Sequence, residues 1–147
     1  ESAWLHKPEL LNRVLSIAQE RTYPVQIHTG LNDNGVINTI GEYLPYCRRF
    51  PELSIDLAHG KPHEDVPAVL AEFPNIYIDT AFVPRETVIS WLDAGADERR
   101  IMFGSDIPAP QRHSKISLSA YIRKESLKFS SLNILHHNAV RFLDIDR

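Results

Sequence analysis

The sequence has little of what marks several common classes of protein. It contains one cysteine, Cys47, which excludes an intrachain disulfide and suits a reducing compartment. It has no apolar run of the ~20 residues that a membrane-spanning helix needs, and no basic-then-apolar signal opens it. Its net charge of −3 is spread along the chain without a basic block that would grip phosphates. We therefore expect a cytoplasmic protein that binds neither nucleic acid nor a membrane.

The sequence also lacks a methionine at its start, because it begins at Glu1 and its only methionine is Met102. This favours a longer parent protein from which an upstream part is missing. The 147 residues and a hydrophobic content of 43% are enough for one domain with a real core. We predict a single domain over residues 1–147.

Helical and strand patterns alternate along the chain. Apolar residues recur at spacings of three and four after Pro8, which predicts a helix over residues 7–21. The segment 31–42 is polar and predicts a long loop, and Pro45 is placed to start a helix. Short β-branched runs predict four strands, over Tyr23–His28, Leu53–Ala58, Ile76–Thr80 and Arg100–Phe103. Further helical patterns cover Val66–Phe73, Pro84–Leu92, residues 115–127 and a last segment from Ser130 or Ser131.

This alternation is typical of parallel strands joined by right-handed crossovers, so the predicted class is α/β. A closed (β/α)8 TIM barrel usually takes ~250 residues. Four strands with flanking helices therefore indicate a partial barrel of the TIM type, and a small open parallel sheet is the alternative.

Three strands are followed by residues that are suited to bind a metal ion or transfer a proton. His28 ends one strand, His59 follows the next, and Asp106 follows the last. The carboxyl ends of parallel strands lie on one face, so these side chains are expected to converge there. Imidazole and carboxylate groups bind zinc and similar ions, which lower the pKa of a bound water to around 7. Taken singly, each residue also fits a purely structural role. His28 could be a hydrogen-bonded histidine at a strand end, His59 could bond a backbone carbonyl, and Asp106 could cap the segment after its strand.

Four segments of the sequence carry a specific resemblance: PVQIHTG at Pro24–Gly30, LAHG at Leu57–Gly60, FGSDIP at Phe103–Pro108 and NILHHNAVRFL at Asn133–Leu143. In this order they resemble successive landmarks of the amidohydrolase-related family, which includes aromatic and heteroaromatic acid decarboxylases, lactone hydrolases and hydratases. The resemblance implies that the visible units are barrel strands five to eight. It implies that His28 is a metal ligand, that His59 binds or polarises the substrate, and that Asp106 binds the metal and handles the proton of the attacking water.

The sequence departs from this family at two points. The pair of metal-binding residues on the first strand, His-x-His or Glu-x-His, has no counterpart here, and Lys61 stands where many relatives have a second glycine. TatD-like nucleases are a poorer match, because Ser105 replaces the acid that usually precedes their last aspartate.

Two function hypotheses follow. In the first, the full-length parent is a metal-dependent hydrolase or decarboxylase of a small carboxylated or cyclic substrate, with zinc, or else manganese, activating water. Asp106 and His59 are then the catalytic residues, and His28 and Asp106 are the metal ligands. In the second, the chain is a noncatalytic barrel fragment or assembly module, inactive by itself.

The loops after the strands are expected to line a pocket for a small-molecule substrate. Besides His59, we expect Asn32, Phe82 and Arg112 to bind substrate, with Arg112 holding a carboxylate. The plain alternative is a solvated loop.

A half-barrel should also expose unpaired strand edges. We therefore predict a homo-oligomer or association with the missing N-terminal half, whereas a stable monomer would favour a self-contained sheet. The pleat decides which of the strands' apolar residues point inward.

Overall fold

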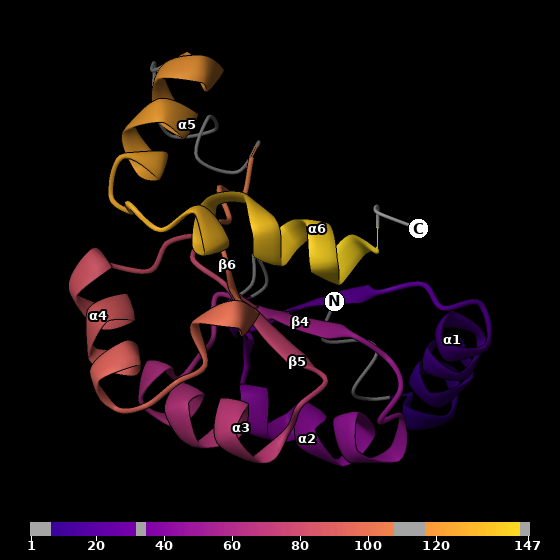
Figure 1. Ribbon diagram of the computed structural model, residues 1–147. Coiled ribbons are helices and arrows are strands. Elements are labelled where there is room, and N and C mark those ends of the chain that lie inside the picture. The colour runs from indigo at the N-terminus through magenta and orange to yellow at the C-terminus, as the bar shows by residue number, and fades with distance from the viewer. Residues whose placement is uncertain (1–6, 32–34, 108–116, 145–147) are drawn as a thin grey trace.

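The computed structural model describes residues 7–31, 35–107 and 117–144 (Figure 1). Its centre is a four-stranded sheet in the order β1 (Val25–His28), β4 (Ile55–Ala58), β5 (Ile76–Asp79) and β6 (Ile101–Met102). All three strand pairings are parallel. The predicted α/β class and the partial barrel are therefore confirmed, with four parallel strands in chain order.

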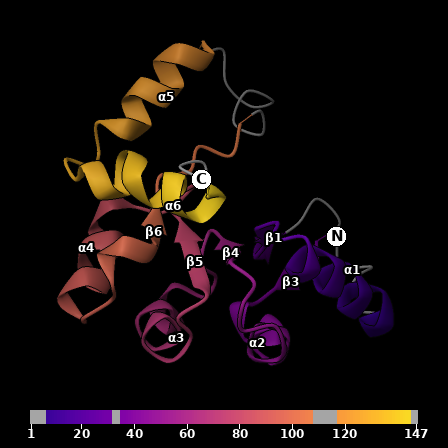
Figure 2. The same ribbon diagram turned by 45° about the vertical axis from the view of Figure 1, so that its right-hand side comes forward.

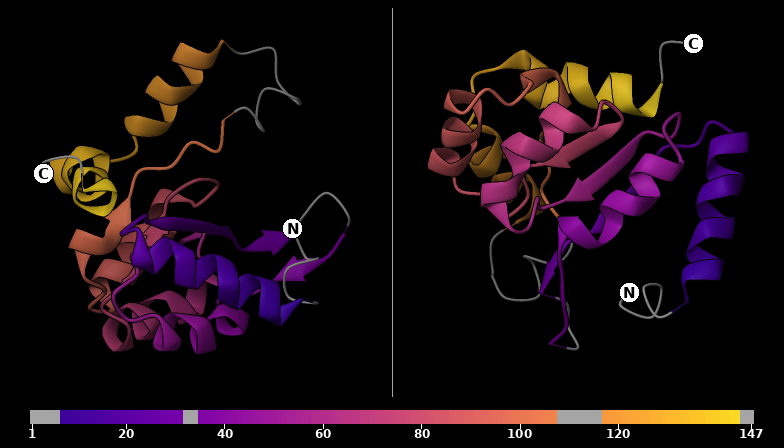
Figure 3. Two further views of the ribbon diagram at one scale, coloured as in Figure 1. Left: turned by 90° about the vertical axis from the view of Figure 1, so that its right-hand side faces the viewer. Right: turned by 90° about the horizontal axis from the view of Figure 1, so that it is seen from below.

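Helices lie on both sides of this sheet. Figures 1 and 2 show α2 (Ile40–Arg49) and α3 (Val66–Glu72) under one face, and α6 (Asn138–Leu143) over the other. In Figure 3, α1 (Pro8–Glu20) lies at the β1 end of the sheet, and α4 (Arg85–Asp93) lies toward the β6 end. A π-helical turn, η4 (Asn133–His137), leads into α6, and α5 (Leu118–Ser126) precedes it. No helix in the described part of the chain is long and apolar enough to cross a membrane.

The first helix matches its prediction. α1 has Pro8 in its first turn and buries Leu11, Leu15 and Ala18, which recur at spacings of three and four. Leu15 is fully buried, and burial of one such side chain contributes roughly 1.5–3 kcal/mol.

The predicted loop over 31–42 differs from the structure. It contains a short antiparallel pair, β2 (Gly30–Leu31) with β3 (Ile37–Asn38), and α2 begins at Ile40 rather than at Pro45. The reason is a capping box: the Thr39 side chain accepts from the backbone of Glu42, and the Glu42 carboxylate accepts from the Thr39 N–H. This cap fixes the helix start one turn earlier, so Pro45 lies within the helix.

The pleat of the strands sorts apolar from polar residues. Ile55, Leu57, Ile76, Ile78 and Ile101 are all fully buried and join the main core with residues of the helices. The opposite face, here called the inner face, is defined by the register-paired residues Gln26, Asp56, Tyr77, Asp79 and Met102.

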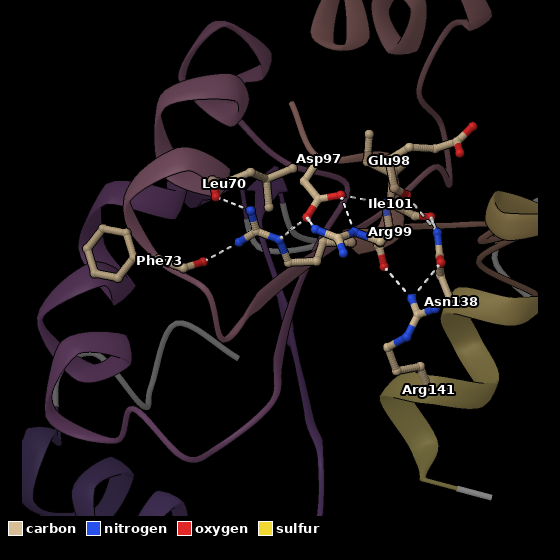
Figure 4. Close-up of polar contacts among 9 residues, drawn as sticks. Leu70, Phe73, Asp97, Glu98, Arg99, Ile101, Asn138 and Arg141 are labelled. Carbon is tan, nitrogen blue, oxygen red and sulfur yellow. Dashed lines mark hydrogen bonds and ion pairs between the residues drawn. The ribbon is translucent and has the colours of Figure 1, made fainter. Parts of the chain in front are cut away.

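The β6 edge of the sheet is occupied by the C-terminal segment. The Asn138 side-chain amide donates to the backbone oxygens of Ile101 at 2.8 Å and Glu98 at 2.6 Å (Figure 4). The Phe103 N–H donates to the Ile134 oxygen at 2.8 Å. On the inner face, the ring of Phe142 packs against Tyr77 with 5.1 Å between centroids. Among the described residues, neither edge of this sheet has a further strand as neighbour, but the β6 edge is covered by the C-terminal segment.

Candidate active site

The structure brings the sequence-predicted strand-end residues together. His28 ends β1 and His59 directly follows β4, and the two strands are hydrogen-bonded neighbours. Their imidazole rings meet edge to face with 5.1 Å between centroids. Asp106, which follows β6, lies close enough for its charge to act on His59. The parallel topology thus gathers side chains that are far apart in the sequence.

The backbone around this cluster is strained. His59, Phe82 and Asp106 have φ values of 69°, 56° and 50°, in the left-handed region. This region is uncommon for residues other than glycine, and it is costliest for bulky ones such as Phe82. Each of these residues follows a different strand of the sheet, and residues held in such conformations concentrate at functional sites. The carboxyl ends of the strands are therefore the candidate active site.

Phe82 forms one side of the cluster. Its ring centroid lies 5.9 Å from that of His59, and 53% of the residue is exposed. An exposed aromatic ring beside a buried histidine offers an apolar surface to a ligand. Asn32 and Arg112, the other predicted substrate contacts, lie outside the described residues.

His59 is held on its Nδ1 side. Nδ1 lies 3.1 Å from the Ala81 carbonyl oxygen and 3.7 Å from Asp79 Oδ1. Because a carbonyl only accepts, Nδ1 carries the hydrogen. Burial by itself lowers the pKa of His59, but the hydrogen bond and charge of Asp79 and the charge of Asp106 outweigh it and raise the pKa overall. The surroundings therefore favour the protonated ring.

A second polar cluster lies on the inner face beneath the strand ends. Asp56 is 1% exposed, and the Gln26 side-chain amide donates to its Oδ2 at 2.7 Å. Its Oδ1 has no hydrogen-bond partner among the described residues. Burial, followed by the negative charge of Asp79, raises the pKa of Asp56 despite the opposing bond from Gln26.

Asp56 and Asp79 were not among the site residues predicted from the sequence. The signal was present in the alternation of IDLA and IYID, which places each aspartate on the face opposite to its isoleucine neighbours.

Three further residues belong to the packing around the site rather than to the strand-end cluster. Trp91 is 2% exposed and is a packing residue. His63 is half-buried and its ring packs against Trp91 with 5.5 Å between centroids. Cys47 is buried, and burial raises the pKa of its thiol to about 12, so it is an inert thiol rather than a nucleophile.

The described residues fit a metal ion only in part. Within residues 7–31, 35–107 and 117–144, no group of three or more His, Cys, Asp or Glu side chains is arranged to hold a metal. His28 and Asp106 are thus two candidate ligands without a third from this part of the chain.

Comparison with known proteins agrees with this geometry. A family model described as amidohydrolase matches residues 1–145. No protein of curated function matches the sequence. Three similar solved structures are amidohydrolase 2 from Bifidobacterium longum subsp. infantis (20% identity, TM-score 0.64), a zinc-bound amidohydrolase from Burkholderia multivorans (17%, 0.56) and 5-carboxyvanillate decarboxylase from Sphingomonas paucimobilis (16%, 0.54).

The alignments with these structures cover 90%, 90% and 89% of this chain but 54%, 56% and 52% of the solved chains. The chain therefore spans about half the length of the solved structures it matches, which agrees with a partial barrel. Because the family model covers nearly every residue, this chain belongs to the amidohydrolase family.

Proposed function

We propose that this chain is the part of a metal-dependent hydrolase or decarboxylase that carries His28, His59 and Asp106. The observation that carries the proposal is the meeting of the His28 and His59 rings at the end of the sheet where Asp106 also lies. The left-handed backbone at His59, Phe82 and Asp106 supports it, because such strain is typical of functional sites.

Each residue has a role in this proposal. His28 and Asp106 would hold a divalent ion, zinc or else manganese, which supplies a Lewis acid when bound. Asp106 is exposed and takes the proton of the attacking water as general base. His59, held by Ala81 and Asp79, stabilises the anion that develops on the substrate.

The proposed substrate is a small carboxylated or cyclic molecule. The exposed ring of Phe82 supplies an apolar contact beside His59. Asn32 and Arg112 are proposed to complete the pocket, with Arg112 binding a carboxylate through paired hydrogen bonds. One of the similar structures is a decarboxylase of 5-carboxyvanillate.

We also propose a cytoplasmic location for the protein. The single cysteine is buried and free, so no intrachain disulfide contributes to the fold. A protein without disulfides is suited to a reducing compartment.

Zinc binding by the purified chain, prepared without a histidine tag, tests the proposed ligands. We expect measurable but weak binding, because two ligands are fewer than the three or four that hold zinc in proteins. His28→Ala and Asp106→Asn should each weaken binding further, by at least about 10-fold, because even the loss of a residue that only orients a ligand typically costs about 10- to 100-fold. Isothermal titration calorimetry, with elemental analysis of dialysed samples, measures both.

The matched controls are His136→Ala and Asp93→Asn, which remove the same functional groups from exposed positions. Their affinity should equal that of the unchanged chain. Equal binding by all five proteins, or no binding by any, would contradict the metal site and favour the noncatalytic barrel fragment.

We propose that the β1 edge pairs with the half of the barrel that the solved relatives have and this chain does not span. A cavity of about 240 Å³ lies along β1, lined mainly by apolar side chains of α1, α2 and β1. Val14, in its wall, is 38% exposed. A second copy closing the barrel would need the β6 edge, which Asn138 and Ile134 already occupy.

Without that half, the purified chain should sediment as a species heavier than its 16.8 kDa monomer, because the apolar edge is uncovered. Val14→Lys should shift the population toward monomer, since a charged side chain in the wall of the cavity opposes burial of this apolar surface. Leu127→Lys, at a residue that is 75% exposed at the end of α5, is the control and should change nothing. A stable monomer of the unchanged chain would instead indicate a self-contained sheet, and a discrete dimer would indicate a second copy as the occupant.

A further inference from the structure

We propose that Asp79 is a positioning residue that fixes the ring of His59. The hydrogen is then held on Nδ1, and Nε2 remains available to the substrate. This inference rests on the role of His59 in the proposed function. It concerns a residue at the end of β5 that is itself no part of the proposed metal site.

The Asp79 carboxylate organises the backbone on both sides of the histidine. Its Oδ1 accepts the Ala81 N–H at 2.8 Å and lies 3.4 Å from the His59 N–H. His59 has a left-handed backbone, with φ of 69°. A strained residue keeps one conformation only when its surroundings hold it, and Asp79 supplies one of these holding contacts.

The same turn sets the state of the imidazole. By binding the Ala81 N–H, Asp79 orients the segment whose carbonyl oxygen lies 3.1 Å from His59 Nδ1. The hydrogen bond at one ring nitrogen determines the tautomer, and therefore which nitrogen remains for chemistry. Asp79 thus acts on His59 through Ala81 as well as directly.

The carboxylate is confined by its neighbours. The Gln26 side-chain amide lies 3.4 Å from Oδ2. A Cβ placed on Gly104 would lie 2.7 Å from Oδ1, so only glycine leaves room for this carboxylate beside the end of β6. The Asp79 side chain is 7% exposed. A group this enclosed is placed to hold other residues rather than to contact a substrate.

Long-range ¹H–¹⁵N NMR of the chain with labelled histidine tests the proposal, with His59 assigned by the signal lost in His59→Gln. At a pH where the ring is neutral, the unchanged chain should show His59 with hydrogen on Nδ1. Asp79→Ala should replace this single tautomer with a mixture. Asp79→Asn should retain it, because the amide oxygen still accepts the Ala81 N–H.

Asp56→Asn is the matched control, since it replaces the neighbouring carboxyl group of the inner face without touching Ala81, and it should leave the tautomer unchanged. Gly104→Ala provides a second perturbation of the same carboxylate and should give the same mixture as Asp79→Ala. Hydrogen on Nε2 in the unchanged chain, or an undisturbed tautomer in both Asp79→Ala and Gly104→Ala, would overturn the proposal. Zinc affinity is measured separately, so failure of the metal site is distinguishable from failure of this inference.

Discussion

Replacing Trp91 by alanine should lower the free energy of unfolding by about 3–5 kcal/mol, the usual cost of removing a large buried aromatic side chain. Trp91 lies on α4, is 2% exposed and belongs to the main core. Its Nε1–H donates to the His63 carbonyl oxygen at 2.8 Å, so the substitution also leaves this oxygen without its donor. Urea denaturation followed by circular dichroism measures the loss.

Trp91→Phe separates the two contributions, because it keeps most of the apolar contact and removes only the donor. It should cost about 1–2 kcal/mol. Ile89→Ala on the same helix, at a residue that is 38% exposed, is the control and should cost much less. If Trp91→Ala unfolded at the same urea concentration as Ile89→Ala, the assignment of Trp91 to the core would be wrong.

This substitution should also disturb the site from a distance. His63 Nε2 lies 3.2 Å from the His59 carbonyl oxygen, and the His63 ring packs on Trp91. The segment that carries His59 is therefore supported by the core residue beneath it. Loss of Trp91 should consequently broaden the NMR signals of the His59 ring.

Asp56→Asn should stabilise the chain by at least about 1 kcal/mol at pH 8, since each unit of pKa shift corresponds to about 1.4 kcal/mol. Burial and the charge of Asp79 raise the pKa of Asp56 above its value of about 3.9 in the unfolded chain. The folded chain therefore retains a proton that the unfolded chain loses as the pH rises. Stability is fully present below about pH 4 and falls as the pH approaches the raised pKa.

Asparagine does not ionise, so the stability of the Asp56→Asn variant should not fall in this way as the pH rises. Its amide oxygen still accepts from Gln26, which preserves the contact made by Asp56 Oδ2. Urea denaturation at several pH values should show similar stability for both proteins near pH 4 and a growing advantage of the variant at higher pH. Asp93→Asn, at an exposed position, is the control. An advantage of Asp56→Asn that was independent of pH would show that Asp56 is not the group whose ionisation matters.

Much of the fold follows from local sequence patterns. The spacing of Leu11, Leu15 and Ala18 predicts α1, and the four β-branched runs predict the four parallel strands. The positions of His28 and His59 at strand ends predict that they meet, because parallel topology places all carboxyl ends on one edge. The start of α2 was predicted wrongly from Pro45, because the capping box at Thr39 and Glu42 begins the helix before the proline.

The sequence by itself determined the α/β class, the order of elements and the strand-end histidines, because these depend on periodicity within short segments. Only the tertiary structure decided that Asn138 covers the β6 edge, and that Ala81 and Asp79 hold His59. These contacts join residues of different elements, or depend on a backbone conformation such as the left-handed one at His59. Local propensity carries no information about contacts between elements or about such a backbone conformation, since the packing of strand ends against one another fixes them.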